Sequence, residues 1–267
     1  MNRIGRVFKE ASRDGRAVFV PYVTAGDPNL DRTIEIASAL ARAGAGVLEL
    51  GVPFSDPIAD GPTNQRAAER ALAIGTSLRD VLRAVREIRK RVDLAVVLFT
   101  YANPVVRYGI DRFSQHAAAS GVDGVLFTDV PAEEMGRFRS PLRQAGIDPI
   151  MLVTPTSTRK RMKAAAKIGG GFLYLVSRVG VTGAQHELDR ELATNVETAR
   201  KASKLPVAVG FGISTPEQVA SVAAIADGVV VGSAIVDIIA EAGDSDEVAL
   251  RVEAFAAPLA AACRRGK

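Results

Sequence analysis

The chain has 267 residues, of which 48% are hydrophobic, and a net charge of +4. The length and the hydrophobic fraction suit one domain over residues 1–267, which we expect to be cytoplasmic. The basic side chains are scattered among acidic ones, so we expect no binding of nucleic acid. Its apolar runs fall short of the roughly 20 residues that cross a membrane, and no apolar leader follows the first charges, so we expect no membrane association. The single cysteine, Cys263, excludes an internal disulfide, and the two histidines leave no metal site.

Short apolar or β-branched runs alternate with helical segments along the whole chain. A helix over Arg3–Arg13 precedes the first run, and a helix that carries Val248 and Leu259 follows Gly243. The clearest helical stripe between them runs from Leu78 to Val92, with apolar residues three and four positions apart. The eight expected strands are Val18–Val23, Val47–Gly51, Leu94–Thr100, Gly124–Thr128, Pro149–Val153, Phe172–Ser177, Pro206–Gly210 and Gly228–Val231.

Three segments repeat one pattern, in which a helix ends and a strand begins: Ala43–Glu49, Ser120–Leu126 and Ile225–Val231. We expect a glycine in each to end the helix in the left-handed conformation, and the apolar run after it suits a parallel strand buried on both faces. Eight such units predict an α/β fold, a (β/α)8 TIM barrel with an extra N-terminal helix and a C-terminal helix. An open doubly wound sheet is the alternative, but it carries a glycine-rich fingerprint after its first strand, and Thr24–Pro28 is not one.

Glu49 is the first candidate catalytic residue. Successive strand residues point to opposite faces, so Leu48 and Leu50 share one face and Glu49 takes the other. If the leucines pack against the helices, Glu49 points into the barrel, where lost hydration favours the protonated carboxyl that a general acid requires. A structural ion pair is the alternative, but the strand runs contain no cation to form one.

The loop after this strand, Pro53–Gln65, contains three prolines and two aspartates. Loops at the carboxyl ends of barrel strands carry active sites. Asp60 is the second catalytic candidate, because the loop returns it to the barrel mouth just before a helix begins near Thr63. Either Asp56 or Asp60 alone could instead simply initiate a turn.

Glycine-rich segments follow the last three expected strands, at Gly180–Ala184, Gly210–Ser214 and Val231–Ala234. Backbone N–H groups of such loops, with a helix N-terminus behind Ser233, form an anion site, and barrels commonly bind phosphate at this place. The segment after the sixth strand would add donors as a mobile lid. The alternative is that these glycines only make tight turns. We therefore expect a small phosphorylated substrate.

The stretch Glu49–Pro57 (ELGVPFSDP), continuing through Ala59–Pro62 to Gln65, resembles the signature of the tryptophan synthase alpha subunit family. The resemblance implies retro-aldol cleavage of indole-3-glycerol phosphate into indole and glyceraldehyde 3-phosphate, without a cofactor in this subunit. It covers essentially the whole chain in order, with further matches at Val23–Pro28, Tyr101–Pro104, Asp129–Glu134, Ser177–Gly183, Gly210–Ser214 and Gly232–Val236.

The resemblance also implies roles for individual residues. Glu49 would be the acid–base that protonates the indole ring at the carbon bearing the side chain, and Asp60 would hold the indole N–H and stabilise the positive charge on the ring. Tyr174 matches the residue that supports Asp60. The other matches are Tyr22 and Tyr101 in the indole pocket, Gly183, Gly212, Gly232 and Ser233 in the phosphate cradle, and Thr182 as the lid residue that contacts Asp60.

The family's partner is a beta subunit that uses pyridoxal phosphate (PLP) and receives the indole through a tunnel, in a heterotetramer of two alpha and two beta chains. Matches at Pro53, Asp56, Asn103 and Pro131 imply an interface with such a partner. Three alternatives remain. The interface matches argue against a stand-alone lyase that releases free indole, and the intact carboxylates argue against a non-catalytic allosteric subunit. Another phosphosugar barrel, such as an isomerase, would need a base that neither histidine supplies at a strand end.

Overall fold

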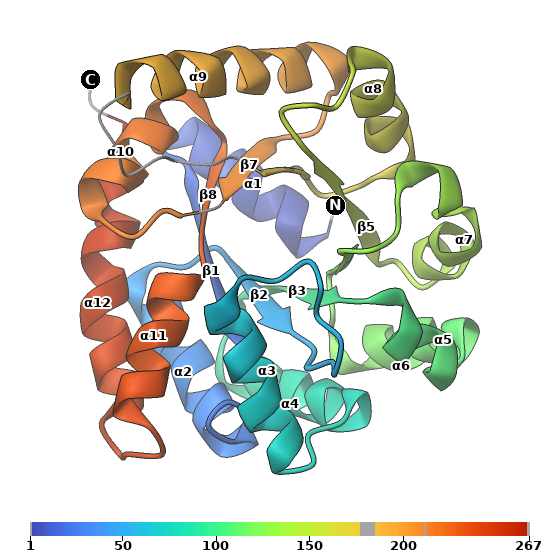
Figure 1. The fold of residues 1–267 in the computed structure, drawn as a ribbon, viewed down its shortest axis with the longest axis vertical. Helices are drawn as coiled ribbons and strands as arrows, with labels where there is room; N and C mark the ends of the chain where they lie inside the picture. The colour runs from blue at the N-terminus through green and yellow to red at the C-terminus, as the bar shows by residue number, and fades with distance from the viewer. Residues whose placement is uncertain (1, 177–184, 211, 266–267) are drawn as a thin grey trace.

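The barrel is closed. The structure is a computed structural model that describes residues 2–176, 185–210 and 212–265. They form eight parallel strands in the order β1 to β8 around one barrel (Figure 1), which confirms the predicted fold and excludes the open sheet. The strands begin and end within one residue of their predicted bounds: Val18–Thr24 (β1), Val47–Gly51 (β2), Ala95–Thr100 (β3), Gly124–Phe127 (β4), Asp148–Val153 (β5), Leu173–Val176 (β6), Val207–Gly210 (β7) and Gly228–Val231 (β8).

Helices surround this barrel, and both predicted additions are present. No helix of the described part of the chain has the length and apolar character needed to cross a membrane. The helices are Arg3–Arg13 (α1), Leu30–Ala43 (α2), Pro62–Ala73 (α3), Leu78–Arg91 (α4), Ala102–Tyr108 (α5), Ile110–Ser120 (α6), Ala132–Glu134 (η1), Gly136–Gln144 (α7), Arg159–Ile168 (α8), Gln185–Ala202 (α9), Pro216–Ile225 (α10), Ser233–Ala242 (α11) and Val248–Ala262 (α12).

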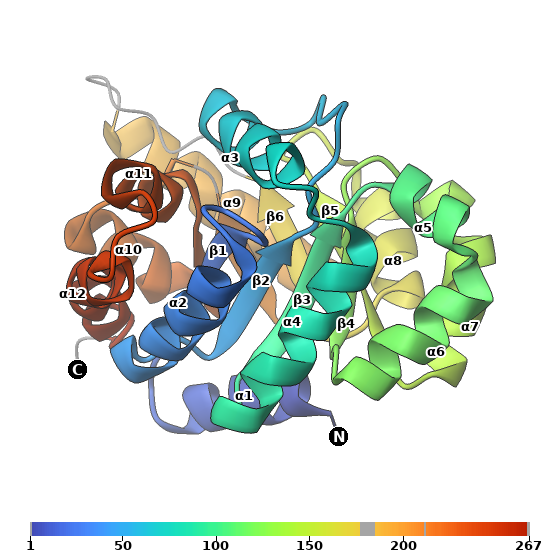
Figure 2. The same ribbon diagram turned by 90° about the horizontal axis from the view of Figure 1, so that it is seen from below.

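Helix α1 closes one end of the barrel. Its buried residues Ile4, Phe8 and Ala11 belong to the same apolar cluster as the inward-facing residues of the strands, and the rings of Phe8 and Phe172 lie 5.4 Å apart. Figure 2 shows α1 at one end of the barrel and α3 at the other. The end where the strands run into their following loops is therefore the one that remains for a functional site.

Strand β2 has the predicted alternation. Leu48 and Leu50 pack in the outer cluster between strands and helices, whereas Val47 belongs to the inner cluster. Glu49 lies in register with Tyr22 of β1 and Val97 of β3. Because the leucines take the outer face, the carboxyl of Glu49 lies inside the barrel, as the period of two predicts.

Two of the three predicted left-handed glycine stops are confirmed. Gly44 follows α2 with φ 104° and Gly121 follows α6 with φ 88°. The third prediction is wrong: α10 ends at Ile225 and the next residue, Ala226, is extended. Gly228 instead begins β8, where an added Cβ would lie 3.0 Å from the Ala208 Cβ. Its missing side chain therefore permits close strand packing and does not end a helix.

Candidate active site

A cavity of about 510 Å³ lies in the open mouth of the barrel. It brings together seven of the predicted site residues: Glu49, Asp60, Tyr174, Tyr22, Gly212, Gly232 and Ser233. All eight strands or the residues that follow them contribute to its wall, which is completed by Ala59, Gly61, Pro62, Thr63, Asn64, Phe99, Thr128, Leu152, Thr154, Val176 and Val230. Residues far apart in the chain thus share one site because parallel strands end together.

Several of these wall residues were not singled out in the sequence, although a signal for them exists. Phe99 pairs with Gly51 and Leu152 pairs with Tyr174 in the strand register. Both lie on the inward face of their strands. Phe99 lies two positions after Val97, the residue that pairs with Glu49, and Leu152 lies directly beside Tyr174. Applying the period of two to every strand end, and not to β2 alone, identifies them.

Glu49 is enclosed in this cavity without a partner. The residue is 1% exposed, and neither carboxyl oxygen makes a hydrogen bond within the described chain. Burial raises the pKa of Glu49 from its ordinary value of 4.5 to about 8, because an ionised carboxylate loses its hydration there. At neutral pH the carboxyl is therefore mostly protonated and can donate a proton.

This raised pKa predicts a stability effect. Between pH 4.5 and about 8 the folded chain keeps a proton that the unfolded chain releases, so Glu49 makes the free energy of unfolding fall by up to about 1.4 kcal/mol per pH unit as pH rises. Glu49→Gln removes this dependence. We expect thermal unfolding to show a larger gain in midpoint for the variant at pH 8 than at pH 5. An equal gain at both pH values would contradict the raised pKa, and Glu69→Gln on the exposed side of α3 controls for the lost charge.

Asp60 is held by its loop and by Tyr101. The Asp60 carbonyl accepts a hydrogen bond of 2.9 Å from the Gln65 side chain, and the Tyr101 hydroxyl accepts one of 3.0 Å from the Ala59 N–H. Burial raises the pKa of Asp60 to about 6, partly opposed by a hydrogen bond from Tyr101. Tyr101, which the sequence placed in the ring pocket, therefore also contacts the Asp60 carboxyl, and the support expected from Tyr174 stays a prediction.

Two tyrosines that line the cavity, Tyr22 and Tyr174, pack against glycines at the ends of the neighbouring strands. A Cβ added at Gly51 would lie 2.3 Å from the Tyr22 hydroxyl, and one added at Gly210 would lie 2.3 Å from the Tyr174 hydroxyl. Because Gly51 and Gly210 have no side chain, the rings of Tyr22 and Tyr174 fit against these strand ends. Burial raises the pKa of both hydroxyls, so they remain neutral and can donate hydrogen bonds.

A candidate anion site lies at the β7 and β8 side of the cavity. Helix α11 begins at Ser233, and its N-cap Gly232 makes no side-chain capping bond, so the first N–H groups of the helix are free to bind a ligand. Gly212 lines the same cavity with φ 71°. Thr182 and Gly183, the other predicted members of the cradle and lid, lie outside the described residues.

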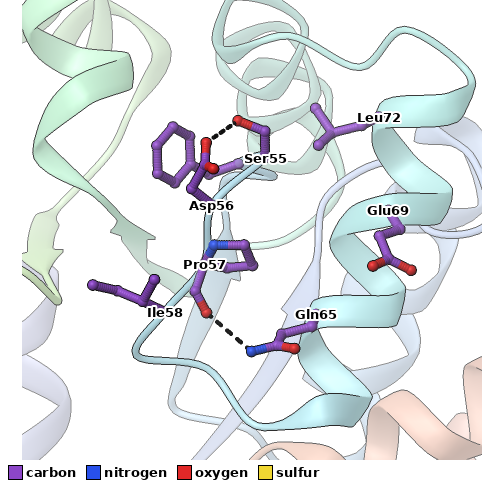
Figure 3. A pocket seen from close by; sticks show the side chains of 8 residues that line it. Ser55, Asp56, Pro57, Ile58, Gln65, Glu69 and Leu72 are labelled. Carbon is purple, nitrogen blue, oxygen red and sulfur yellow. Dashed lines mark hydrogen bonds between the residues drawn. The ribbon is translucent and has the colours of Figure 1, made fainter.

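The loop between β2 and α3 has a second, smaller pocket of about 250 Å³ against α3, lined by Phe54, Ser55, Asp56, Pro57, Ile58, Gln65, Glu69 and Leu72. Figure 3 shows the Ser55 hydroxyl bonded to the Asp56 carboxylate and Gln65 bonded to the Pro57 carbonyl. Ile58 is 86% exposed. This loop thus presents an apolar side chain beside a charged one on the molecular surface.

Three of the four residues predicted at a partner interface are exposed: Asp56, Asn103 and Pro131. Pro53 is buried, because it lies at the root of the loop where the chain leaves β2. Its place at the partner interface stays a prediction. In the part of the chain that the structure describes, no group of three His, Cys, Asp or Glu residues is arranged to hold a metal ion.

Comparisons with known proteins agree on one family. The model of the tryptophan synthase alpha chain family matches residues 8–264. The tryptophan synthase alpha chain of Solibacter usitatus is 47% identical over 96% of this chain and 96% of its own, and that of Xanthomonas axonopodis pv. citri is 46% identical over 100% of both. The structure is similar to tryptophan synthase subunit alpha from Legionella pneumophila, with a TM-score of 0.91 and 38% identity over 98% of each chain. A Mycobacterium tuberculosis tryptophan synthase chain has a TM-score of 0.90 and 37% identity over 99% of each.

Proposed function

Because the chain belongs to the tryptophan synthase alpha chain family, we infer that Glu49 and Asp60 perform the chemistry of its reaction. The enzyme is a lyase that cleaves indole-3-glycerol phosphate into indole and glyceraldehyde 3-phosphate, and the indole passes to the beta subunit for tryptophan synthesis. The observation that carries the assignment is the buried, unpartnered carboxyl of Glu49 in the cavity that Asp60 also lines.

The reaction begins with a proton transfer from Glu49 to the ring carbon that bears the glycerol chain. The ring becomes a cation, which the Asp60 carboxylate stabilises while it accepts the indole N–H. The carboxylate left on Glu49 then takes the proton of the adjacent chain hydroxyl, that oxygen forms the aldehyde, and the C–C electron pair returns to the ring. Glu49 ends protonated again, so no oxidant or reductant is consumed.

The two carboxyls differ in pKa, and this difference fits their roles. Glu49 has a pKa of about 8 and Asp60 one of about 6. Between these values Glu49 keeps its proton while Asp60 is ionised, which gives an acid and a cation-stabilising carboxylate in one cavity. We propose that Tyr22 and Tyr101 line the ring pocket and that Tyr174 supports Asp60. The proposed phosphate cradle is Gly183, Gly212, Gly232 and Ser233, with Thr182 as the proposed lid residue.

Acid, base and charge stabilisation suffice for this cleavage, so we propose that the subunit needs no cofactor of its own and that PLP belongs to the beta partner. The proposed assembly is a heterotetramer of two alpha and two beta chains, which meets Asp56, Asn103 and Pro131. Residues 1–267 would make one domain, since α1 and α12 both pack on the barrel. A cytoplasmic location suits an enzyme of a phosphorylated metabolite.

An assay of indole release tests the function directly. Purified chain is mixed with indole-3-glycerol phosphate, alone and with a tryptophan synthase beta subunit. Slow release that rises markedly with the partner supports the proposal. Fast release without the partner would identify a stand-alone lyase, and no release under either condition would contradict the assignment of Glu49 and Asp60.

Asp56 is the best point at which to test the interface. It is exposed, beside Ile58, on the loop that carries Asp60. We expect Asp56→Lys to raise the beta-subunit concentration needed for half-maximal activation about tenfold, a loss of about 1.4 kcal/mol, because reversing a charge at an interface removes its electrostatic complementarity. The measurement is a titration of indole release with beta subunit. Glu191→Lys, an exposed position on α9, should leave the titration unchanged; an equal shift for both variants would remove Asp56 from the interface.

A further inference from the structure

The described residues have four buried side-chain oxygens without a hydrogen-bond partner, and three of them border the active-site cavity. Two are the carboxyl oxygens of Glu49 and the third is Oδ1 of Asn64; the fourth, of Thr76, lies elsewhere. A buried polar atom without a partner lowers stability. The reaction accounts for Glu49, but nothing in it so far uses Asn64.

Asn64 occupies a helix face that is otherwise made of alanine. Residues three, four and seven positions further along α3 are Ala67, Ala68 and Ala71, all of them buried. Positions with this spacing lie on one face of a helix. The side chain of Asn64 therefore lies on the inner face of α3, where the helix reaches the cavity and where an apolar residue would avoid the cost of the unpaired oxygen.

The position of α3 places Asn64 between the catalytic carboxyl and the anion site. Ala67 of α3 packs with Tyr22 of β1 and Val236 of α11. Strand β1 lies between β2, which carries Glu49, and β8, which leads into the anion site. At this side of the cavity, a Cβ added at Gly232 would lie 3.5 Å from the Tyr22 Cβ.

The substrate chain must cross this same space. Its phosphate is at the β7 and β8 side, and its reacting carbon is at Glu49, so the three carbons between them pass Tyr22 and the start of α3. Two hydroxyl groups lie on that chain. Glu49 takes the proton of the first. The second, on the middle carbon, keeps its proton through the reaction and needs a hydrogen-bond partner when it leaves bulk water.

We propose that the side-chain amide of Asn64 hydrogen-bonds this second hydroxyl, which makes Asn64 a specificity-determining residue for the hydroxylated chain. The inference rests on the proposed function. An amide carries an acceptor at one end and donors at the other, and a hydroxyl can pair with either. A site built to pair a substrate hydroxyl discriminates against the ligand that lacks it, because the protein group is then left unpaired.

Binding of two ligands tests the proposal. Glu49→Gln prevents turnover, so the dissociation constants of indole-3-glycerol phosphate and of indole-3-propanol phosphate, which has the same ring and phosphate but no chain hydroxyls, are measured by calorimetry on the full chain. Adding Asn64→Leu should weaken the glycerol phosphate about tenfold, the value of one hydrogen bond of about 1.4 kcal/mol. Binding of the propanol phosphate should stay within about twofold or tighten, since the substitution removes only a partner that this ligand does not use.

Controls separate the possible failures. Asn64→Ala continues the alanine face and serves as a second variant should leucine overfill the cavity, and Thr63→Val, a neighbouring wall residue, should change both ligands equally or not at all. Equal weakening of both ligands by the Asn64 variants, or no weakening of the glycerol phosphate, overturns the inference while the proposed function stands. If the chain with Glu49→Gln alone binds neither ligand, the proposed function fails, and the inference fails with it.

Discussion

Glu49→Gln should lower kcat for indole release by about 10²–10⁴-fold, the contribution of a positioned general acid. Glutamine keeps the shape of the side chain but cannot give a proton to the ring carbon. Because Glu49 makes no hydrogen bond that the substitution would break, the variant should fold and still bind the substrate. Steady-state assays with and without the beta subunit measure the loss, and circular dichroism checks the fold.

The pH profile distinguishes an acid from a structural carboxyl. The pKa of Glu49 is about 8, so kcat/KM of the native chain should fall above pH 8 as the proton is lost. Glu69→Gln, on the exposed side of α3, is the matched control and should keep both the rate and the profile. A Glu49→Gln enzyme that retains kcat within tenfold of the native value would eliminate Glu49 as the acid, because that loss is below the range for this role.

Asp60→Asn should lower kcat by about 10²–10³-fold, as the removal of a group that stabilises charge in the transition state does. An amide can still meet the indole N–H through its oxygen, but it carries no negative charge to balance the ring cation. The pKa of Asp60 is about 6, so the native rate should also fall below pH 6 as the carboxylate is protonated. Pre-steady-state assays of ring protonation and indole release measure the step affected.

The same loop supplies a control for this variant. Asp56→Asn changes an exposed carboxylate four residues earlier and should leave cleavage by the isolated subunit unchanged. Asp60→Asn should in addition remove the acidic limb of the pH profile and keep the limb near pH 8. Retention of the acidic limb would assign that limb to another group and would contradict the role of Asp60.

The local sequence pattern correctly predicted those features that depend on residues close together in the chain. All eight strands appear at their predicted positions, and Gly44 and Gly121 end their helices as expected. After Ile225 the pattern gave a wrong prediction, because Gly228 lies three residues after the helix and allows close packing of its strand against Ala208. Two distant segments meet there, and sequence spacing contains no information about that contact.

The sequence by itself determined the barrel, the inward direction of Glu49 and the arrival of Asp60 at the barrel mouth, since these follow from strand alternation and from the common end of parallel strands. Only the tertiary structure decided how deeply each carboxyl is buried, that Tyr101 contacts Asp60, that Pro53 is buried, and that the Asn64 oxygen is unpaired. Burial and hydrogen-bond partners depend on residues that are distant in the chain and adjacent in the fold. The pKa values that permit the chemistry therefore arise only when the barrel closes.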